Sequence, residues 1–358
     1  MRVEDWQSPS VRGDEAPRRC GWRTQSRGTG LRASLWLTCL LMTLPLVTTS
    51  CGKGSAPNLP DPTVGAPASG SYQETLRTEL DERRRTYRVH IPSGYTGSER
   101  WPLVVVVHGA FNTGRGMEEK TGFSELADRE GFLVAYPDGI GLRGLFQHWN
   151  AGFCCGKALR LGIDDVGFLD QMIQRLSDRL AVDPQRIYMI GESNGAMLTY
   201  LYASRHPSRL AAAGVSAGAT GGIRGGARDP DGELFRIEPP EHPVPLIAFH
   251  GLADDRVPFS GRDDGITVPV EEGLERWAQA NGCEPDPATE EQRQGTVHHR
   301  VWNQGPACAP VELYTLEGWP HQWPGERFTR KLEGEENSAL AGFDAAEVAW
   351  GFFEGYPN

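Results

Sequence analysis

The pentapeptide Gly191-Glu192-Ser193-Asn194-Gly195 fits the pattern G-x-S-x-G, which presents a serine between two small residues. Residues 186–191 before it predict a β-strand, and residues 195–204 predict a helix. A tight turn between these elements would hold the serine hydroxyl at the helix N-terminus, where the helix dipole and N–H groups favour negative charge. We therefore predict that Ser193 is a catalytic nucleophile. A purely structural turn is the alternative.

A serine hydroxyl is a weak nucleophile, so it needs a general base nearby. His321 lies in a loop just after a predicted strand, residues 311–316, and α/β sheets place ligands and chemistry at the carboxyl ends of their strands. A strand-to-helix serine turn also goes with the chain order serine, acid, histidine. We predict His321 as the base. The alternatives downstream are His250, His298 and His299.

The acid that orients the imidazole should lie between the nucleophile and the histidine in the chain. Residues 246–250 predict a strand, and Asp254 and Asp255 follow it in a turn. Either carboxylate could accept a hydrogen bond from the histidine. Asp138 also follows a predicted strand, but it precedes the nucleophile and fits a turn residue better.

The tetrahedral intermediate of acyl transfer carries an oxyanion, which backbone N–H groups can bind. The first donor should be Asn194, the residue after the nucleophile. The second should follow an early core strand, and residues 103–107 (LVVVV) lead directly into the sequence HGA. We predict the Ala110 N–H as the second donor, with Phe111 as the alternative, and a structural role for His108.

Predicted strands and helices alternate along the chain, which favours an α/β fold with a mostly parallel sheet. The β-branched run at residues 103–107 is typical of a strand buried on both sides. The predicted strands are residues 87–91, 103–107, 133–136, 186–191, 213–215, 246–250 and 311–316. The predicted helices are residues 123–130, 166–180, 195–204, 270–280 and 345–353.

Residues 1–51 have the features of a secretion signal. Arg23, Arg27 and Arg32 precede an apolar run at residues 35–47, and the small residues TTS follow it. A basic region, a short apolar region and small residues describe a secretory signal, and 13 residues are too few to span a membrane comfortably. Cys51 comes next, as in bacterial lipoproteins, so we predict an exported chain whose only membrane attachment is a lipid on Cys51. A plain cleaved signal is the alternative.

Residues 52–71 are rich in Gly, Pro, Ser and Ala and predict a flexible linker, which leaves residues 72–358 for one catalytic domain. The whole chain is 39% hydrophobic and 23% charged, as in globular proteins. Its formal net charge is −11, and residues 1–51 hold seven Arg and four acidic residues, so the remainder carries −14. A negative surface argues against a nucleic-acid partner and favours a neutral substrate.

Four cysteines remain after residue 51, and export favours disulfides. Three pairings are open to them. Cys283 and Cys308 bracket a polar stretch, so we predict a disulfide between them and a second one between Cys154 and Cys155. Free thiols at the adjacent pair are the alternative. The sequence has no CxxC or HExxH motif, so we expect no metal and no cofactor.

With these residues in place, the chain resembles the secreted α/β-hydrolases of the polyhydroxybutyrate depolymerase-like and feruloyl esterase-like family, which includes bacterial lipoproteins. The matching segments span almost all of residues 72–358. They are TYRVHIPSGY (86–95), PLVVVVHGA (102–110), AYPDG (135–139), HWNAGFCCG (148–156), DDVGFL (164–169), RIYMIGESNGAM (186–197), HGLADDRVPF (250–259), WAQANGC (277–283) and HQWPG (321–325).

The resemblance implies an α/β-hydrolase fold, with helices on both faces of the sheet and no large separate cap domain. It implies Ser193 as nucleophile, His321 as base and Asp254, rather than Asp255, as acid. Leu252 stands where the family pattern has Thr, and the aligned acid is still present. The family also carries both pairs of cysteines, which supports the predicted disulfides.

The residues and the resemblance together predict a serine esterase that hydrolyses carboxylic esters through an acyl-enzyme. The expected substrate is a small aromatic or carbohydrate ester or a short polyester. Trp149, Trp319 and Trp323 flank the motif loops and are candidates for substrate contact, with ordinary packing as the alternative. The alternative functions are a serine peptidase of the same fold and a non-catalytic surface-binding lipoprotein.

Overall fold

The chain divides into two units, Met1–Lys53 and Gly54–Asn358, and the computed structural model describes residues of the second unit only. The described residues are 56–61, 65–79, 82–142, 144–226, 229, 231–262, 264–286, 288–293, 296–325 and 342–357. The predicted signal and Cys51 therefore lie outside them. Within the described residues, no helix is both long and apolar enough to cross a membrane.

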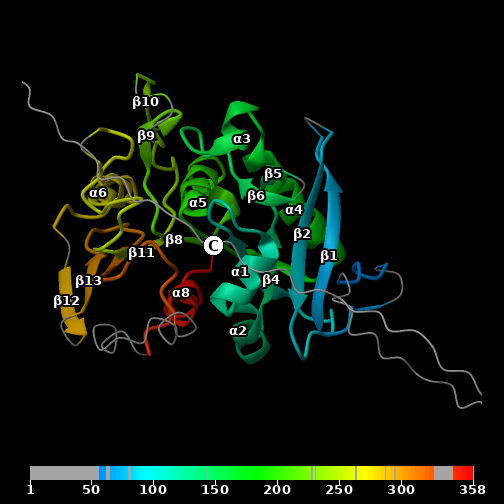
Figure 1. Cartoon of the computed structure of the whole chain (residues 1–358). Helices are drawn as coiled ribbons and strands as arrows, with labels where there is room; N and C mark the ends of the chain where they lie inside the picture. The colour runs from blue at the N-terminus through cyan, green and yellow to red at the C-terminus, as the bar shows by residue number, and fades with distance from the viewer. Residues whose placement is uncertain are drawn as a thin grey trace, which may run out of the picture. The chain divides into compact units, whose positions relative to one another are not determined.

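A ten-stranded sheet forms the centre of the second unit (Figure 1). The order across it is β1 (Gly70–Arg77), β2 (Arg84–Ile91), β4 (Leu133–Pro137), β3 (Trp101–Val107), β7 (Val182–Glu192), β8 (Ala212–Ser216), β11 (Leu246–Gly251), β14 (Val311–Leu316), β13 (Val297–Trp302) and β12 (Ala288–Arg293). The six strands from β4 to β14 are parallel, and the two pairs at the edges are antiparallel. The predicted α/β fold with a mostly parallel sheet is confirmed.

Strand β3 shows why the centre of the sheet reads as continuous apolar sequence. Every residue from Leu103 to Val107 is fully buried. Successive side chains point to opposite faces, so Leu103 and Val105 join one hydrophobic core and Val104 and Val106 join the other. A strand buried on both faces needs no polar alternation, which is the pattern that its sequence has.

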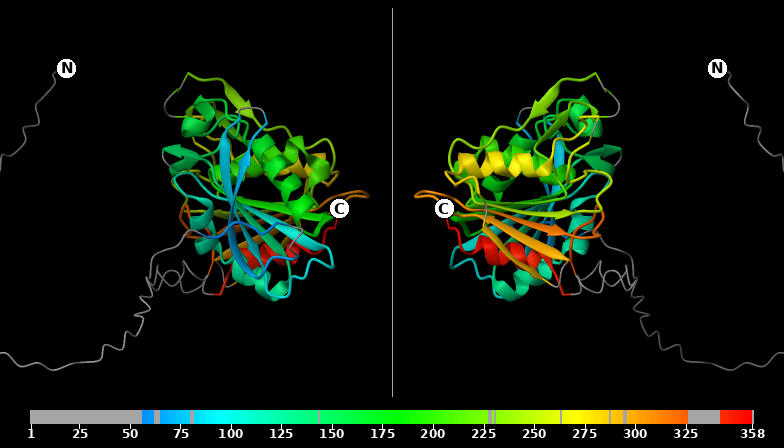
Figure 2. Two further views of the ribbon diagram at one scale, coloured as in Figure 1. Left: turned by 90° about the vertical axis from the view of Figure 1, so that its right-hand side faces the viewer. Right: turned by 90° about the vertical axis from the view of Figure 1, so that its left-hand side faces the viewer.

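Helices cover both faces of the sheet, as expected (Figure 2). One core contains the buried residues of α4 (Asp165–Arg179), α5 (Asn194–Arg205) and α6 (Val270–Ala280). The other contains those of α1 (Gly114–Thr121), α2 (Phe123–Glu130) and α8 (Ala345–Phe353). The side chain of Asp164 caps α4 by accepting the Gly167 N–H at 2.9 Å, which fixes where this helix begins.

Several short elements were not predicted from the sequence. The hairpin β5 (Ile140–Leu142) and β6 (Leu145–His148), the helix α3 (Gly156–Arg160), and the ribbon β9 (Gly221–Ile223) and β10 (Leu234–Arg236) lie above the sheet in Figure 1. The polar stretch between Cys283 and Cys308 forms the edge hairpin β12–β13. Each of these elements is short or polar, so it has no clear hydrophobic periodicity from which a helix or strand could be predicted.

The predicted linker, residues 52–71, needs a correction in both of its halves, because parts of it pack against the domain. Strand β1 begins at Gly70, and Leu59 is buried against the domain. The Leu59 N–H donates to Glu74 Oε1 at 2.7 Å, and Arg179 Nη2 donates to the Leu59 carbonyl at 3.0 Å. Side chains of the domain thus satisfy backbone groups that a Pro-rich segment cannot pair by itself.

Candidate active site

The turn between β7 and α5 carries Ser193 in a backbone conformation that is rare for a residue with a side chain. Its φ is 54° and its ψ is −121°. The Ser193 N–H donates to the Ser216 carbonyl on β8 at 2.8 Å, which helps to hold the turn. A φ in this region costs free energy and persists only where the surroundings impose it, as they do at many functional sites.

Steric constraints require glycine at both glycine positions of the motif. A side chain on Gly191 would overlap the Gly195 carbonyl, and one on Gly195 would overlap the Val107 and His108 carbonyls. The turn therefore packs directly against the end of β3. The G-x-S-x-G spacing gives the tight turn that brings the serine hydroxyl to the start of α5.

The structure brings Ser193, His321 and Asp254 together. His321 Nε2 lies 2.8 Å from Ser193 Oγ, and His321 Nδ1 lies 2.6 Å from Asp254 Oδ2. Asp254 and His321 lie in the turns after β11 and β14, which are adjacent parallel strands whose carboxyl ends meet at one edge. Asp255, the alternative acid, is exposed.

Asp254 is held in its ionised form. Burial acts to raise the pKa of its carboxyl, but the hydrogen bond and charge of His321, with the Val257 N–H, bring that pKa below its ordinary value. Its other oxygen, Oδ1, accepts the N–H groups of Arg256 and Val257, each at 2.9 Å. A buried carboxylate with these partners can orient the imidazole and stabilise its cation.

The alternative histidines make other contacts, and His250 Nε2 also lies 3.6 Å from Asp254 Oδ2. Burial lowers the pKa of His250, and its Nε2 donates to the Val257 carbonyl at 2.8 Å. His298 and His299 lie on β13, next to the edge strand β12, where they contact Glu317 and Glu312. Burial also lowers the pKa of His108, to about 4, so it is neutral at physiological pH and has the structural role that we expected.

The two predicted oxyanion donors both border the cavity above the serine. Ala110 follows β3, and Asn194 is the first residue of α5, where N–H groups have no acceptor within the helix. The Phe111 N–H, the alternative donor, is already bonded to the Gln147 carbonyl at 2.8 Å. This bond makes Ala110 the better candidate.

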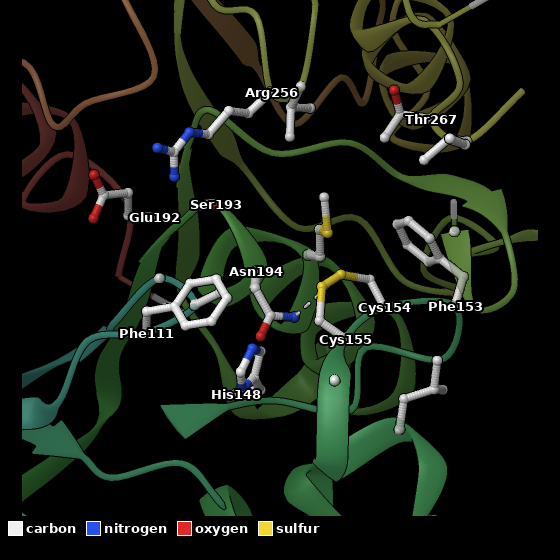
Figure 3. A pocket seen from close by; sticks show the side chains of 18 of the residues that line it. Phe111, His148, Phe153, Cys154, Cys155, Glu192, Ser193, Asn194, Arg256 and Thr267 are labelled. Atoms are coloured by element: carbon white, nitrogen blue, oxygen red, sulfur yellow. Dashed lines mark hydrogen bonds between the residues drawn. A yellow bond between two sulfur atoms is a disulfide. The ribbon is translucent and has the colours of Figure 1, made fainter. Parts of the chain in front are cut away.

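Ser193 and His321 line a cavity of about 700 Å³, and Figure 3 shows part of its lining. Its wall is partly apolar and partly charged. The apolar lining includes Phe111, Phe153, Leu159, Met197, Ile223, Val257 and Ile266, and the charged lining consists of Lys120, Arg160, Glu192, Asp229 and Arg256. A cavity of this size and composition suits a small ester.

The loop from His148 to Gly156 forms one wall and includes the Cys154–Cys155 disulfide, which faces the cavity. Asn194 binds this loop with its side chain, since its Oδ1 accepts the Trp149 N–H at 2.7 Å and its Nδ2 donates to the Trp149 carbonyl at 3.2 Å. The residue after the nucleophile therefore joins the oxyanion site to this wall.

A buried ion pair supports the same loop from beneath. Arg85 Nη2 on β2 lies 2.7 Å from Asp165 Oδ1 at the start of α4, and both side chains are almost fully buried. Asp165 Oδ2 accepts the Asn150 N–H at 2.7 Å, and the Arg85 guanidinium lies over the Phe168 and Trp149 rings. Neither Arg85 nor Asp165 was predicted from the sequence as a residue that supports the site.

The three tryptophans that we predicted as substrate contacts are instead buried, and none lines the cavity. Trp149 Nε1 donates to the His108 carbonyl at 2.8 Å, and Trp319 Nε1 donates to the Gln322 carbonyl at 3.0 Å. Trp323 packs against Phe123. Their rings fill the space behind the motif loops, so this prediction is corrected in favour of core packing.

Phe111 and Phe153 are the aromatic residues that do line the cavity. We did not predict Phe153 from the sequence, and we predicted only the backbone N–H of Phe111, as an alternative oxyanion donor. Their positions beside the HGA and CC motifs could have indicated that these two side chains line the site. Cys283 and Cys308 are joined by a disulfide, as expected, and neither lines the cavity. Among the described residues, no group of three or more His, Cys, Asp or Glu side chains could hold a metal ion.

The sheet order, the serine turn and the position of the triad at the carboxyl ends of the strands define an α/β-hydrolase. An acetyl xylan esterase from Aspergillus awamori shares this fold, with a TM-score of 0.52 at 15% identity over 73% of this chain and 97% of that one.

Sequence comparisons show which enzymes the chain is similar to. Residues 85–248 match the family described as esterase PHB depolymerase. The chain is 30% identical over 243 residues to feruloyl esterase B of Piromyces equi and 26% identical over 250 residues to poly(3-hydroxyalkanoate) depolymerase C of Paucimonas lemoignei. These alignments cover 65% and 66% of this chain, and 42% and 58% of those proteins. The chain is similar to polyhydroxybutyrate depolymerase-like and feruloyl esterase-like α/β-hydrolases, and its predicted class, carboxylic ester hydrolase, agrees with these relatives.

Proposed function

We propose that this protein is an exported serine esterase that cleaves carboxylic esters through an acyl-enzyme formed on Ser193. The observation that carries the proposal is the hydrogen-bonded series from Asp254 through His321 to Ser193 Oγ, with distances of 2.6 and 2.8 Å, at the edge of an open cavity. The nucleophile needs a base that takes its proton, and the base needs an acid that orients it. This series supplies both contacts.

The first half-reaction transfers the acyl group to the enzyme. His321 Nε2 takes the hydroxyl proton as Ser193 Oγ forms a bond to the ester carbonyl carbon. The N–H groups of Ala110 and Asn194 donate to the resulting oxyanion. When the intermediate collapses, its C–O bond to the alcohol breaks, and the imidazolium gives its proton to the departing alcohol. Asp254 stays ionised throughout and stabilises that imidazolium.

The second half-reaction returns the enzyme to its starting state. A water molecule attacks the acyl carbon while His321 accepts one of its protons. The same two N–H groups hold the second oxyanion. Collapse breaks the bond to Ser193 Oγ, which regains a proton from His321, and the carboxylic acid leaves. One water is consumed for each ester cleaved.

The expected substrates are small aromatic or carbohydrate esters and short polyesters. The apolar part of the cavity, with Phe111 and Phe153, supports an aromatic or aliphatic group near the serine. The relatives named feruloyl esterase and poly(3-hydroxyalkanoate) depolymerase support the same range. We further propose export directed by residues 1–51, with lipidation of Cys51, on the basis of the sequence pattern alone.

The proposal is tested with the purified protein and p-nitrophenyl acetate. Ser193→Ala should lower kcat/KM by at least about 10³-fold, because no other group can form the acyl-enzyme. Ser177→Ala, on the outer part of α4, is the matched control and should keep wild-type turnover. Hydrolysis that survived Ser193→Ala would contradict the proposal. A wild-type protein inactive on esters, but active on a peptide p-nitroanilide, would favour a serine peptidase, and inactivity on both would favour a binding role.

A further inference from the structure

Charge is distributed unevenly around the cavity. Lys120 Nζ and the buried Glu192 form an ion pair, so their charges offset each other. Arg256, by contrast, has no hydrogen bond or ion pair from its side chain to any described residue, although it lines the cavity together with Ser193 and His321. An otherwise acidic protein thus places an unpartnered guanidinium beside its proposed catalytic serine.

The backbone of Arg256 is fixed by the proposed catalytic acid. Its N–H donates to Asp254 Oδ1 at 2.9 Å, and the next N–H, of Val257, donates to the same oxygen at 2.9 Å. The Val257 carbonyl in turn accepts a hydrogen bond from His250. The loop is therefore held through main-chain groups, and the Arg256 side chain is left to contact whatever occupies the cavity.

The two sides of the cavity differ in character. In Figure 3, Arg256 and Glu192 lie on one side of Ser193, whereas Phe153 and the Cys154–Cys155 disulfide lie on the other. An ester bound across the serine would place one end against the apolar wall and the other beside Arg256. A guanidinium next to a bound molecule recognises carboxylates best, since its planar N–H groups can bind both oxygens at once.

We infer that Arg256 selects esters that carry a separate ionised carboxylate, such as O-acylated hydroxy acids with a free acid end. The inference rests on the proposed esterase function and adds a substrate class to it. It differs from the expectation of a neutral substrate, which came from net charge. Net charge acts over long range and is screened by salt, whereas a partner within the cavity acts at contact distance.

The experiment compares 3-acetoxybutyrate with 3-acetoxybutyramide, which differ in charge but little in size. Acetate release is measured at low salt and pH 7.5. The wild-type protein should prefer the carboxylate by about tenfold in kcat/KM, the range expected for a charge-assisted contact at a partly exposed site. Arg256→Gln should reduce this ratio to about one, mainly through a higher KM for the carboxylate, because the contact exists in both the bound and the transition state.

Two variants serve as comparisons. Arg205→Gln removes an exposed arginine at the end of α5, outside the cavity lining, and should keep the wild-type ratio despite the same change in net charge. Arg160→Gln removes the other cavity arginine without a partner among the described residues. Loss of the preference in Arg160→Gln but not in Arg256→Gln would overturn the inference, as would a wild-type ratio near one.

The same assay separates the inference from the proposed function. Turnover of the neutral amide that disappears in Ser193→Ala supports the esterase mechanism whatever the charge preference proves to be. If Ser193-dependent turnover occurs with both compounds at equal kcat/KM, only the role of Arg256 fails. Absence of Ser193-dependent turnover with either compound would overturn the inference, and its absence with p-nitrophenyl acetate as well would overturn the esterase mechanism.

Discussion

The two sides of the active-site cavity are assembled in different ways. On the catalytic side, Ser193, Asp254 and His321 come from turns at the carboxyl ends of the parallel strands β7, β11 and β14, and each contacts another member of the triad. On the opposite side, the loop that carries the disulfide is held by Arg85 and Asp165, neither of which lines the cavity. On the catalytic side, the reacting side chains hold one another in position. On the opposite side, buried residues outside the cavity hold the loop in position.

This difference separates effects on rate from effects on folding. Ser193 can be replaced with little loss of packing, because its backbone is held by a main-chain bond to Ser216. The buried ion pair cannot lose one partner without leaving an uncompensated charge in the protein interior. Substitutions on the catalytic side should therefore change kcat, and those under the loop should change stability.

The largest expected effect is on the catalytic side. Asp254→Asn should lower kcat for p-nitrophenyl acetate by about 10⁴-fold, because the amide can no longer stabilise the imidazolium or fix its tautomer. Asp255→Asn is the matched control, since that side chain is exposed and should matter less than about twofold. Equal losses in the two variants would contradict the assignment of the acid.

The next largest effect concerns the buried ion pair that supports the loop and its contribution to the free energy of unfolding. Arg85→Met should lower the free energy of unfolding by about 3–5 kcal/mol, because Asp165 would remain buried without its cation. Urea denaturation measures this value. The double variant with Asp165→Asn should recover part of it, since the Asn side chain can still accept the Asn150 N–H. A double variant no more stable than Arg85→Met would argue against the ion pair as the cause.

A smaller effect depends on pH and on His108, whose carbonyl holds Trp149. The pKa of His108 is about 4 in the folded protein and about 6.5 in the unfolded chain. Between these values only the unfolded chain binds the proton, so the stabilisation is present above pH 6.5 and is lost as the pH falls towards 4. The free energy of unfolding should drop by about 2 kcal/mol from this group between pH 7 and pH 5. His108→Gln should show a correspondingly weaker dependence, and an unchanged dependence would count against a neutral buried imidazole.

The smallest effect is expected at Trp323, which is fully buried and lies outside the cavity lining. Trp323→Phe should change KM for methyl ferulate by less than about twofold, while it lowers stability by about 1 kcal/mol through lost packing. Phe153→Ala, within the cavity lining, is the contrast and should raise that KM. A larger change in KM for Trp323→Phe than for Phe153→Ala would restore the tryptophan as a substrate contact.

The sequence predicted the parts of the fold that have strong local signals. The seven predicted strands and five predicted helices all form, because each has a clear hydrophobic period or a continuous apolar run. The edge hairpin β12–β13 and the hairpin β5–β6 were missed. Their strands are polar or short, and edge strands are defined by their neighbours more than by their own composition.

At the site, local sequence was enough to predict the motif residues, but it did not predict the direction of nearby side chains. The G-x-S-x-G turn imposes its geometry on Ser193, so this position could be predicted. Trp319 and Trp323 flank His321 in the chain, yet their rings point into the core. Arg85 and Asp165 are 80 residues apart and meet only through the packing of β2 and α4, which no local pattern reports.

The central claim, that Ser193 is a nucleophile activated by His321, is tested most directly by covalent labelling. The full chain is treated with a fluorophosphonate, and the modified peptide is identified by mass spectrometry. The account predicts one label, on Ser193, that is abolished by Ser193→Ala and slowed by at least about 10³-fold by His321→Ala. Labelling of another residue, or labelling of Ser193 at an unchanged rate in His321→Ala, would contradict it.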